Sequence, residues 1–136
     1  QFLMAERSDI SAFSLDSPVF DFEEIVKSEL KWNGIPPIIW RLAVFMGKLH
    51  GIDIYEKSPK DGIKKIGNRA LMVMHGTDDT RVPFLHSERL VKFASSLGKE
   101  VKFIVNNNSD HNEALLMEPE LIRKNLIEFF EKNLTN

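Results

Sequence analysis

The apolar positions of the chain follow two spacings, one typical of helices and one typical of buried strands. Apolar residues recur every three or four positions in some segments, as at Leu90, Ala94 and Leu97, and form short unbroken runs in others, as in ALMVM at 70–74. The first spacing predicts helices over 21–30, 38–52, 83–98 and 118–134. The helix-forming residues at the start of the chain predict a further helix over 1–7. The second spacing predicts strands over 10–15, 70–76 and 100–106.

The order of these elements determines the expected fold. Strands that are joined by helical crossovers run parallel, with helices covering both faces of the sheet. We therefore expect a single α/β domain over 1–136, built on a parallel sheet flanked by helices. Three strands make a thin sheet, so the first strand is expected to leave an edge with unpaired backbone groups. Such an edge favours self-association.

Composition and charge exclude several classes of protein. The chain has 136 residues, 43% of them apolar, which is enough for one packed core. The net charge is −2 with acids and bases interspersed, so no basic face suggests nucleic acid. Cys is absent, which excludes disulfides and thiolate metal sites and fits a cytoplasmic protein. No apolar run is long enough for a membrane span, and the start of the chain resembles no signal peptide.

Polar clusters follow the second and third predicted strands. His75, Asp78 and Asp79 come at the end of the first of these strands, and His111 follows the other in the loop NNNSDH. The carboxyl ends of parallel strands are where open α/β sheets bind ligands and carry out chemistry. An acid from one loop can there accept the Nδ1–H of a histidine from the other and orient its ring for general-base catalysis.

The stretch from Ala70 to His111 resembles the C-terminal portion of an α/β-hydrolase of the prolyl oligopeptidase-like type. Sequences of that group contain, in this order, an apolar strand, the motif H-G-x-x-D-x-x-V-P, a helix with Ser near its start, a short strand, and a loop that ends in His. The matching positions here are His75, Gly76, Asp79, Val82, Pro83, Ser87, Leu90 and His111. The resemblance implies that Asp79, four residues after the motif histidine, is the triad acid, and that His111 is the base. Asp78 is the competing acid.

The other histidines and the second loop acid receive ordinary structural interpretations. His75 is expected to be a turn residue at the end of a strand. His50 and His86 lie on predicted helices and are expected to be surface or packing residues. Asp110, next to His111, is interpreted as a solvated loop acid.

A nucleophile is missing from this pattern. The triad order in α/β-hydrolases is nucleophile, acid, histidine, with the nucleophile on a G-x-S-x-G elbow. None of the ten serines has such flanking glycines. The chain also begins without Met, in residues that resemble the end of the elbow helix. The resemblance then implies that this chain is the C-terminal half of the fold, and that the nucleophile lies in an absent N-terminal half. A serine is the expected nucleophile, with cysteine and aspartate as alternatives.

The segment 18–57 resembles the helical excursion that forms a lid in these enzymes. Its apolar side chains Trp32, Trp40, Phe45 and Met46 are candidates for lining an acyl or side-chain pocket. The competing interpretation, which we favour for amphipathic helices, is that they pack against the sheet.

The resemblance therefore implies a serine hydrolase of esterase or peptidase type that needs no cofactor and no metal. A small acyl ester or a peptide is the expected substrate, and the chain alone is expected to be inactive. Self-association or pairing with its own N-terminal half is the expected assembly. A non-catalytic interaction domain on the same scaffold is the alternative, because fold alone does not establish activity. A small flavodoxin-type or receiver-type domain is disfavoured, because the chain has neither a Gly-rich phosphate loop nor an early acid pair.

Overall fold

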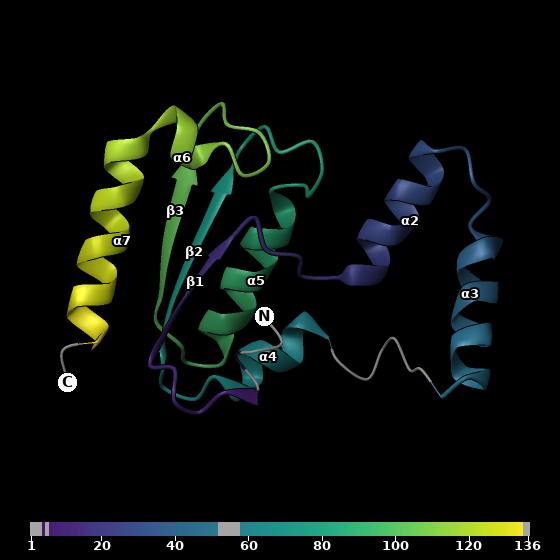
Figure 1. The fold of residues 1–136 in the computed structure, drawn as a ribbon, viewed down its shortest axis with the longest axis horizontal. Helices are drawn as coiled ribbons and strands as arrows, with labels where there is room; N and C mark the ends of the chain where they lie inside the picture. The colour runs from purple at the N-terminus through teal and green to yellow at the C-terminus, as the bar shows by residue number, and fades with distance from the viewer. Residues whose placement is uncertain (1–3, 5, 52–57, 135–136) are drawn as a thin grey trace.

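The computed structural model describes residues 4, 6–51 and 58–134, and these form a three-stranded parallel sheet with helices on both faces (Figure 1). The strands are β1 (Ala12–Asp16), β2 (Ala70–Gly76) and β3 (Val101–Asn106), in the order β1-β2-β3. The helices are α2 (Phe22–Trp32), α3 (Ile38–Leu49), α4 (Pro59–Lys65), α5 (Leu85–Ser96), α6 (Ala114–Met117) and α7 (Pro119–Leu134). The expected fold class is confirmed. Most of the predicted helix over 1–7 lies outside the described residues.

Successive side chains of the central strand β2 point to opposite faces of the sheet, and each set belongs to a separate apolar cluster. Leu71 and Val73 point to the face covered by α4 and α5, where they pack with Leu90. Met72 and Met74 point to the opposite face, where α6 and α7 supply the rest of the core. Because β2 is buried on both faces, its sequence is a continuous apolar run, as parallel sheets require. This strand therefore holds the polar residues at its carboxyl end in a rigid frame.

The helix α4 was not predicted from the sequence, where its segment was interpreted as a polar connection. Ser58 caps the helix by accepting the N–H of Asp61, and the Asp61 side chain accepts in return from Ser58. This reciprocal capping box stabilises a short helix whose polar composition gives no periodic signal. Ile63 and Ile66 anchor it in the core.

The helices α2 and α3 extend away from the sheet beyond α5 (Figure 1). The favoured expectation, that their apolar residues pack against the sheet, is wrong, since neither helix contains a buried residue. The exposed apolar side chains of α3 are Ile38, Ile39, Leu42, Phe45, Met46 and Leu49. An amphipathic pattern shows that a helix has a face to bury, but it does not identify the surface that covers it.

The two ends of this excursion meet beside the body of the domain. Lys60, where the chain returns, lies 3.6 Å from the Asp21 carboxylate and 4.6 Å from the centre of the Phe20 ring, where the chain departs. The backbone N–H of Phe20 donates to His86 Nδ1 on α5 at 3.2 Å. His86 is therefore a packing residue, and burial lowers its pKa. His50, which follows α3, is exposed.

The open edge of β1 is the expected site of association. The N–H of Ser17 and the carbonyl of Ser11 bond to β2, so the alternate residues Ala12, Ser14 and Asp16 direct their backbone groups to the other side. We expect light scattering after size exclusion to show an assembly larger than 15.6 kDa. Ser14→Pro removes an outward N–H without breaking a bond to β2, so it should reduce the assembly to a monomer. A monomer before substitution would refute this expectation, and an assembly that survives it would place the contact elsewhere.

Within the described parts of the chain, no helix combines the length and the hydropathy needed to cross a bilayer.

Candidate functional site

The turn that follows β2 holds Asp79 by its own backbone. One carboxylate oxygen, Oδ1, accepts the N–H of Arg81 at 2.9 Å and the N–H of Val82 at 2.7 Å. These bonds close the turn in the TDDTRV segment and leave the second oxygen, Oδ2, directed toward the loop after β3. The side chain of Asp79 is fully buried.

His111 completes the contact across the two loops. Its Nδ1 lies 2.8 Å from Asp79 Oδ2, although the two residues are 32 positions apart in the chain. The carboxylate is an acceptor only, so Nδ1 carries the proton and Nε2 of the neutral ring keeps a lone pair. The His111 side chain is 23% exposed, so the ring is reachable from solvent. The predicted proximity of Asp79 and His111 is confirmed.

The surroundings of Asp79 keep its carboxyl ionised. Burial raises its pKa, but hydrogen bonds from the Val82 N–H and the His111 ring outweigh burial, and the pKa lies below its ordinary value. An ionised carboxylate at this position can stabilise a protonated His111. Asp16, at the end of β1, is a further acid near the pair, and partial desolvation raises its pKa.

Direct hydrogen bonds join the two loops that carry the pair. The N–H of Thr77 donates to Asn106 O at 2.9 Å, and the N–H of Asp78 donates to Ser109 O at 3.1 Å. Gly76 permits this approach, because a Cβ there would lie 2.1 Å from Ser109 O. The loops thus form one unit, in which the position of the acid fixes that of the histidine.

Asp110 is a partly solvent-exposed loop acid, as interpreted, but it also makes hydrogen bonds that the sequence did not indicate. Its Oδ1 accepts the Thr80 N–H at 2.8 Å and the His111 N–H at 2.7 Å, and the Thr80 hydroxyl bonds to the same carboxylate. The N–H of Thr80 is the main cause that lowers the pKa of Asp110. Asp110 therefore connects the acid loop to the backbone of His111. Adjacency to His111 in the sequence gave no signal of a partner 30 positions away.

Removing this connection should loosen both loops. We expect Asp110→Ala to accelerate hydrogen exchange at the amides of Thr80 and His111 while amides in β2 stay protected. Mass-spectrometric or NMR exchange of the chain measures this directly. Asp78→Ala is the matched control, because Asp78 is exposed and its carboxylate accepts only the adjacent Thr77 hydroxyl among the bonds described. Equal exchange in the two variants would contradict the role given to Asp110.

His75 is also placed differently from the prediction. It is not a turn residue but the penultimate residue of β2, with a fully buried side chain. Its Nε2 lies 3.1 Å from Asp79 Oδ2, on the inner side of the carboxylate. Its Nδ1 lies 2.5 Å from the hydroxyl of Ser87, which is also buried.

Among the described residues, no group of three or more His, Cys, Asp or Glu side chains could hold a metal ion.

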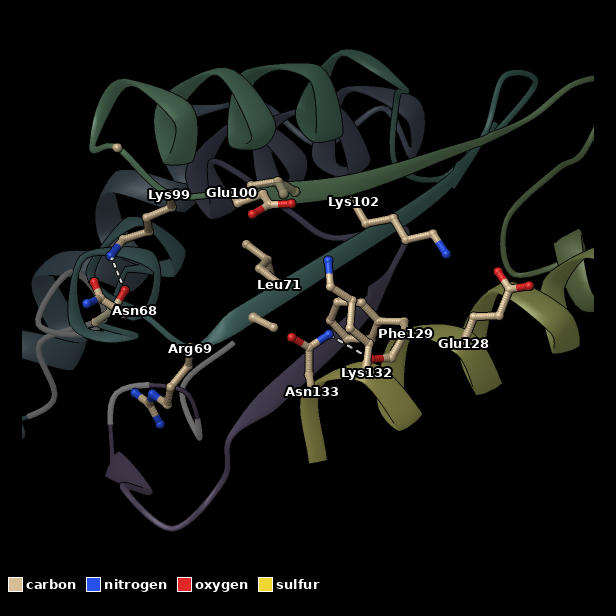
Figure 2. Close-up of a pocket in the computed structure, with 14 residues that line it drawn as sticks. Asn68, Arg69, Leu71, Lys99, Glu100, Lys102, Glu128, Phe129, Lys132 and Asn133 are labelled. Carbon is tan, nitrogen blue, oxygen red and sulfur yellow. Dashed lines mark hydrogen bonds between the residues drawn. The ribbon is translucent and has the colours of Figure 1, made fainter. Parts of the chain in front are cut away.

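A hollow of about 640 Å³ lies at the opposite end of the sheet, where β2 and β3 begin (Figure 2). Two of its lysines bond to main-chain carbonyls: Lys99 to Gly67 O at 2.8 Å and Lys102 to Asn125 O at 3.3 Å. Glu100 and Glu128 also line it. The hollow is therefore remote from Asp79 and His111 and contributes nothing to their chemistry.

Comparison with known proteins places this geometry in context. Residues 41–136 match the prolyl oligopeptidase family. An esterase of Pyrococcus furiosus is similar in structure, with a TM-score of 0.67 and 15% identity over 96% of this chain and 47% of its own. An acylaminoacyl peptidase of Pyrococcus horikoshii is similar with a TM-score of 0.67 and 18% identity over 98% of this chain and 22% of its own. The chain thus spans about half of the esterase and about a fifth of the peptidase. No curated protein matches it significantly.

Proposed function

Because the chain belongs to the prolyl oligopeptidase family, we propose that it is the part of a serine hydrolase that supplies the acid and the histidine of the triad. The substrate class is an acyl ester or a peptide, as the names of the similar esterase and acylaminoacyl peptidase suggest. The reaction is acyl transfer to a nucleophile followed by transfer to water.

One observation carries this proposal. A fully buried carboxylate holds Nδ1 of a solvent-accessible imidazole at 2.8 Å, at the carboxyl edge of a parallel sheet. A buried acid cannot bind substrate, but it can fix the tautomer and orientation of the ring beside it. The ring then presents Nε2 outward as a general base.

The chemical steps follow from this arrangement. His111 Nε2 takes the proton of the nucleophile as the nucleophile bonds to the substrate carbonyl carbon. The imidazolium that forms is stabilised by Asp79, and it returns the proton to the leaving group when the acyl bond breaks. Water then attacks the acyl intermediate with His111 again as base, which regenerates the nucleophile. No step requires Asp79 to become protonated.

We place the nucleophile outside this chain. Ser87 and Ser109 are the serines nearest in sequence to the site loops, and both are fully buried. The hydroxyl of Ser87 bonds to His75, on the inner side of Asp79, and is not directed at the exposed ring of His111. An N-terminal half that pairs with β1 would bring the nucleophile to the carboxyl edge of the same sheet.

The second candidate, a non-catalytic interaction domain, is favoured by the exposed apolar surface of α3. Six large apolar side chains of this helix are exposed, a surface that in soluble proteins marks a contact with a partner or a ligand. The same surface serves the enzyme hypothesis equally well if it closes over an acyl group.

Hydrolysis of an activated short-chain acyl ester separates these candidates. We expect turnover and fluorophosphonate labelling for the protein in which this chain continues from an N-terminal half, and neither for the 136-residue chain alone. Turnover by the chain alone that disappears on Ser87→Ala or Ser109→Ala would show that the nucleophile lies within this sequence. Absence of both turnover and labelling in the longer protein would favour the interaction domain.

A further inference from the structure

The inner side of Asp79 is occupied by a histidine that the triad itself does not use. His75 is fully buried, and its ring meets the ring of Phe84 edge-on, with centres 5.6 Å apart and planes at 81°. Both ring nitrogens have partners. Nδ1 lies 2.5 Å from Ser87 Oγ, and Nε2 lies 2.8 Å from Val82 O and 3.1 Å from Asp79 Oδ2.

The partners determine where the proton of His75 lies. A main-chain carbonyl and a carboxylate accept hydrogen bonds and donate none, so Nε2 must carry the proton. Ser87 can donate its hydroxyl proton to Nδ1, so the neutral ring satisfies every polar atom of this buried group. The chain therefore fixes a single tautomer of His75, whose Nε2–H bonds to the Val82 carbonyl and lies beside Asp79 Oδ2.

The carboxylate of Asp79 is consequently enclosed by polar groups at both oxygens. The N–H groups of Arg81 and Val82 bond to Oδ1, and the imidazoles of His75 and His111 both approach Oδ2. The two backbone donors set the plane of the carboxylate. The buried His75 ring bonds to the carbonyl of Val82, whose N–H donates to Oδ1, and the ring lies 3.1 Å from Oδ2.

We propose that His75 is a positioning residue for the Asp79–His111 pair, acting through a Nε2–H tautomer that Ser87 supports. This inference rests on the proposed function for its catalytic meaning, but the hydrogen-bond arrangement can be tested without activity. The titratable groups that face Asp79 are His75 from β2, His111 from the loop after β3 and Asp16 from the end of β1.

Two substitutions distinguish the loss of the Nε2–H donor of His75 from the loss of the volume of its ring. His75→Phe keeps an aromatic ring and removes both nitrogens, whereas His75→Gln keeps an N–H near the position of Nε2. The titration of Asp79 is followed by carbon NMR of its carboxyl group in the 136-residue chain, with Asp79→Asn as the assignment control. We expect the midpoint to move upward by about one pH unit in His75→Phe and to return close to the original value in His75→Gln.

A purely structural role would give a different result. Loss of packing alone would lower the melting temperature in both variants without moving the Asp79 midpoint selectively in His75→Phe. An unchanged midpoint in His75→Phe, or an equal shift in both variants, would overturn the proposal. If His75→Phe does not fold, nitrogen NMR of the original chain tests the proposal instead. A Nδ1–H tautomer of His75 would contradict the proposal.

Labelling of the longer protein by a fluorophosphonate connects the arrangement to catalysis. We expect His75→Phe to slow labelling by roughly tenfold to a hundredfold and His75→Gln to restore most of the rate. If the unsubstituted protein is not labelled at all, the proposed function fails while the NMR result still stands. If labelling is normal in His75→Phe, the positioning role fails while the proposed function stands.

Discussion

Replacing His111 by alanine is expected to lower the rate of acyl hydrolysis by roughly four orders of magnitude or more in the protein that contains the whole triad. The effect is large because, in the proposed mechanism, the ring both removes the proton of the nucleophile and returns it to the leaving group. Stability should change little, since the side chain is partly exposed and its one described side-chain partner is Asp79. Ester hydrolysis and fluorophosphonate labelling measure the effect.

His50→Ala is the matched control for this experiment, because His50 is exposed at the end of α3. It should leave both the hydrolysis rate and the labelling unchanged. Labelling that persists at its original rate in His111→Ala would remove His111 from its proposed role, whatever the rate of the control.

Gly76→Ala is expected to destabilise the chain by about 3 kcal/mol and to separate the two site loops. A Cβ at this position would lie 2.1 Å from Ser109 O and 2.7 Å from Ser109 C, both of them backbone atoms that cannot rotate away. The loop after β3 would have to retreat, and the bonds from Thr77 and Asp78 across the gap would lengthen or break. Chemical denaturation measures the first effect, and the Asp79–His111 coupling by NMR titration measures the second.

Gly67→Ala provides the comparison. Gly67 has φ +64 and open space around the added Cβ, so its substitution costs only backbone strain, about 1 kcal/mol. Equal losses of stability at the two positions would mean that the close approach at Gly76 is absorbed by the loops and does not hold the site together.

The fold was predictable from the sequence wherever an element buries a regular face. The run ALMVM identified β2 because both of its faces are covered, as its continuous apolar sequence requires. The helix α4 escaped prediction because it is stabilised by a capping box and two anchoring isoleucines instead of a long periodic stripe. The sequence of Ser58, Pro59 and Asp61 contains that signal, although a weak one.

The candidate site was predictable only in part, for a geometric reason. The order of strands places the two loops at one edge, and the family resemblance selected Asp79 over Asp78 as the partner of His111. The contacts of Asp110 with Thr80 and of His75 with Ser87 depend on loop conformation and on which face of β2 a side chain occupies. Neither can be read from spacing along the chain, so a buried partner of the acid was mistaken for a turn residue.

The contact between Lys60 and the Phe20–Asp21 segment has a consequence for how proteins with this sheet diverge. Since the chain leaves and re-enters the domain at nearly one point, the segment between is an insertion that the sheet neither stretches nor constrains. Its length and sequence are free to change by insertion or deletion while strand register and the Asp79–His111 contact remain the same. The sequences of α2 and α3 can therefore change independently of the residues that hold Asp79 against His111.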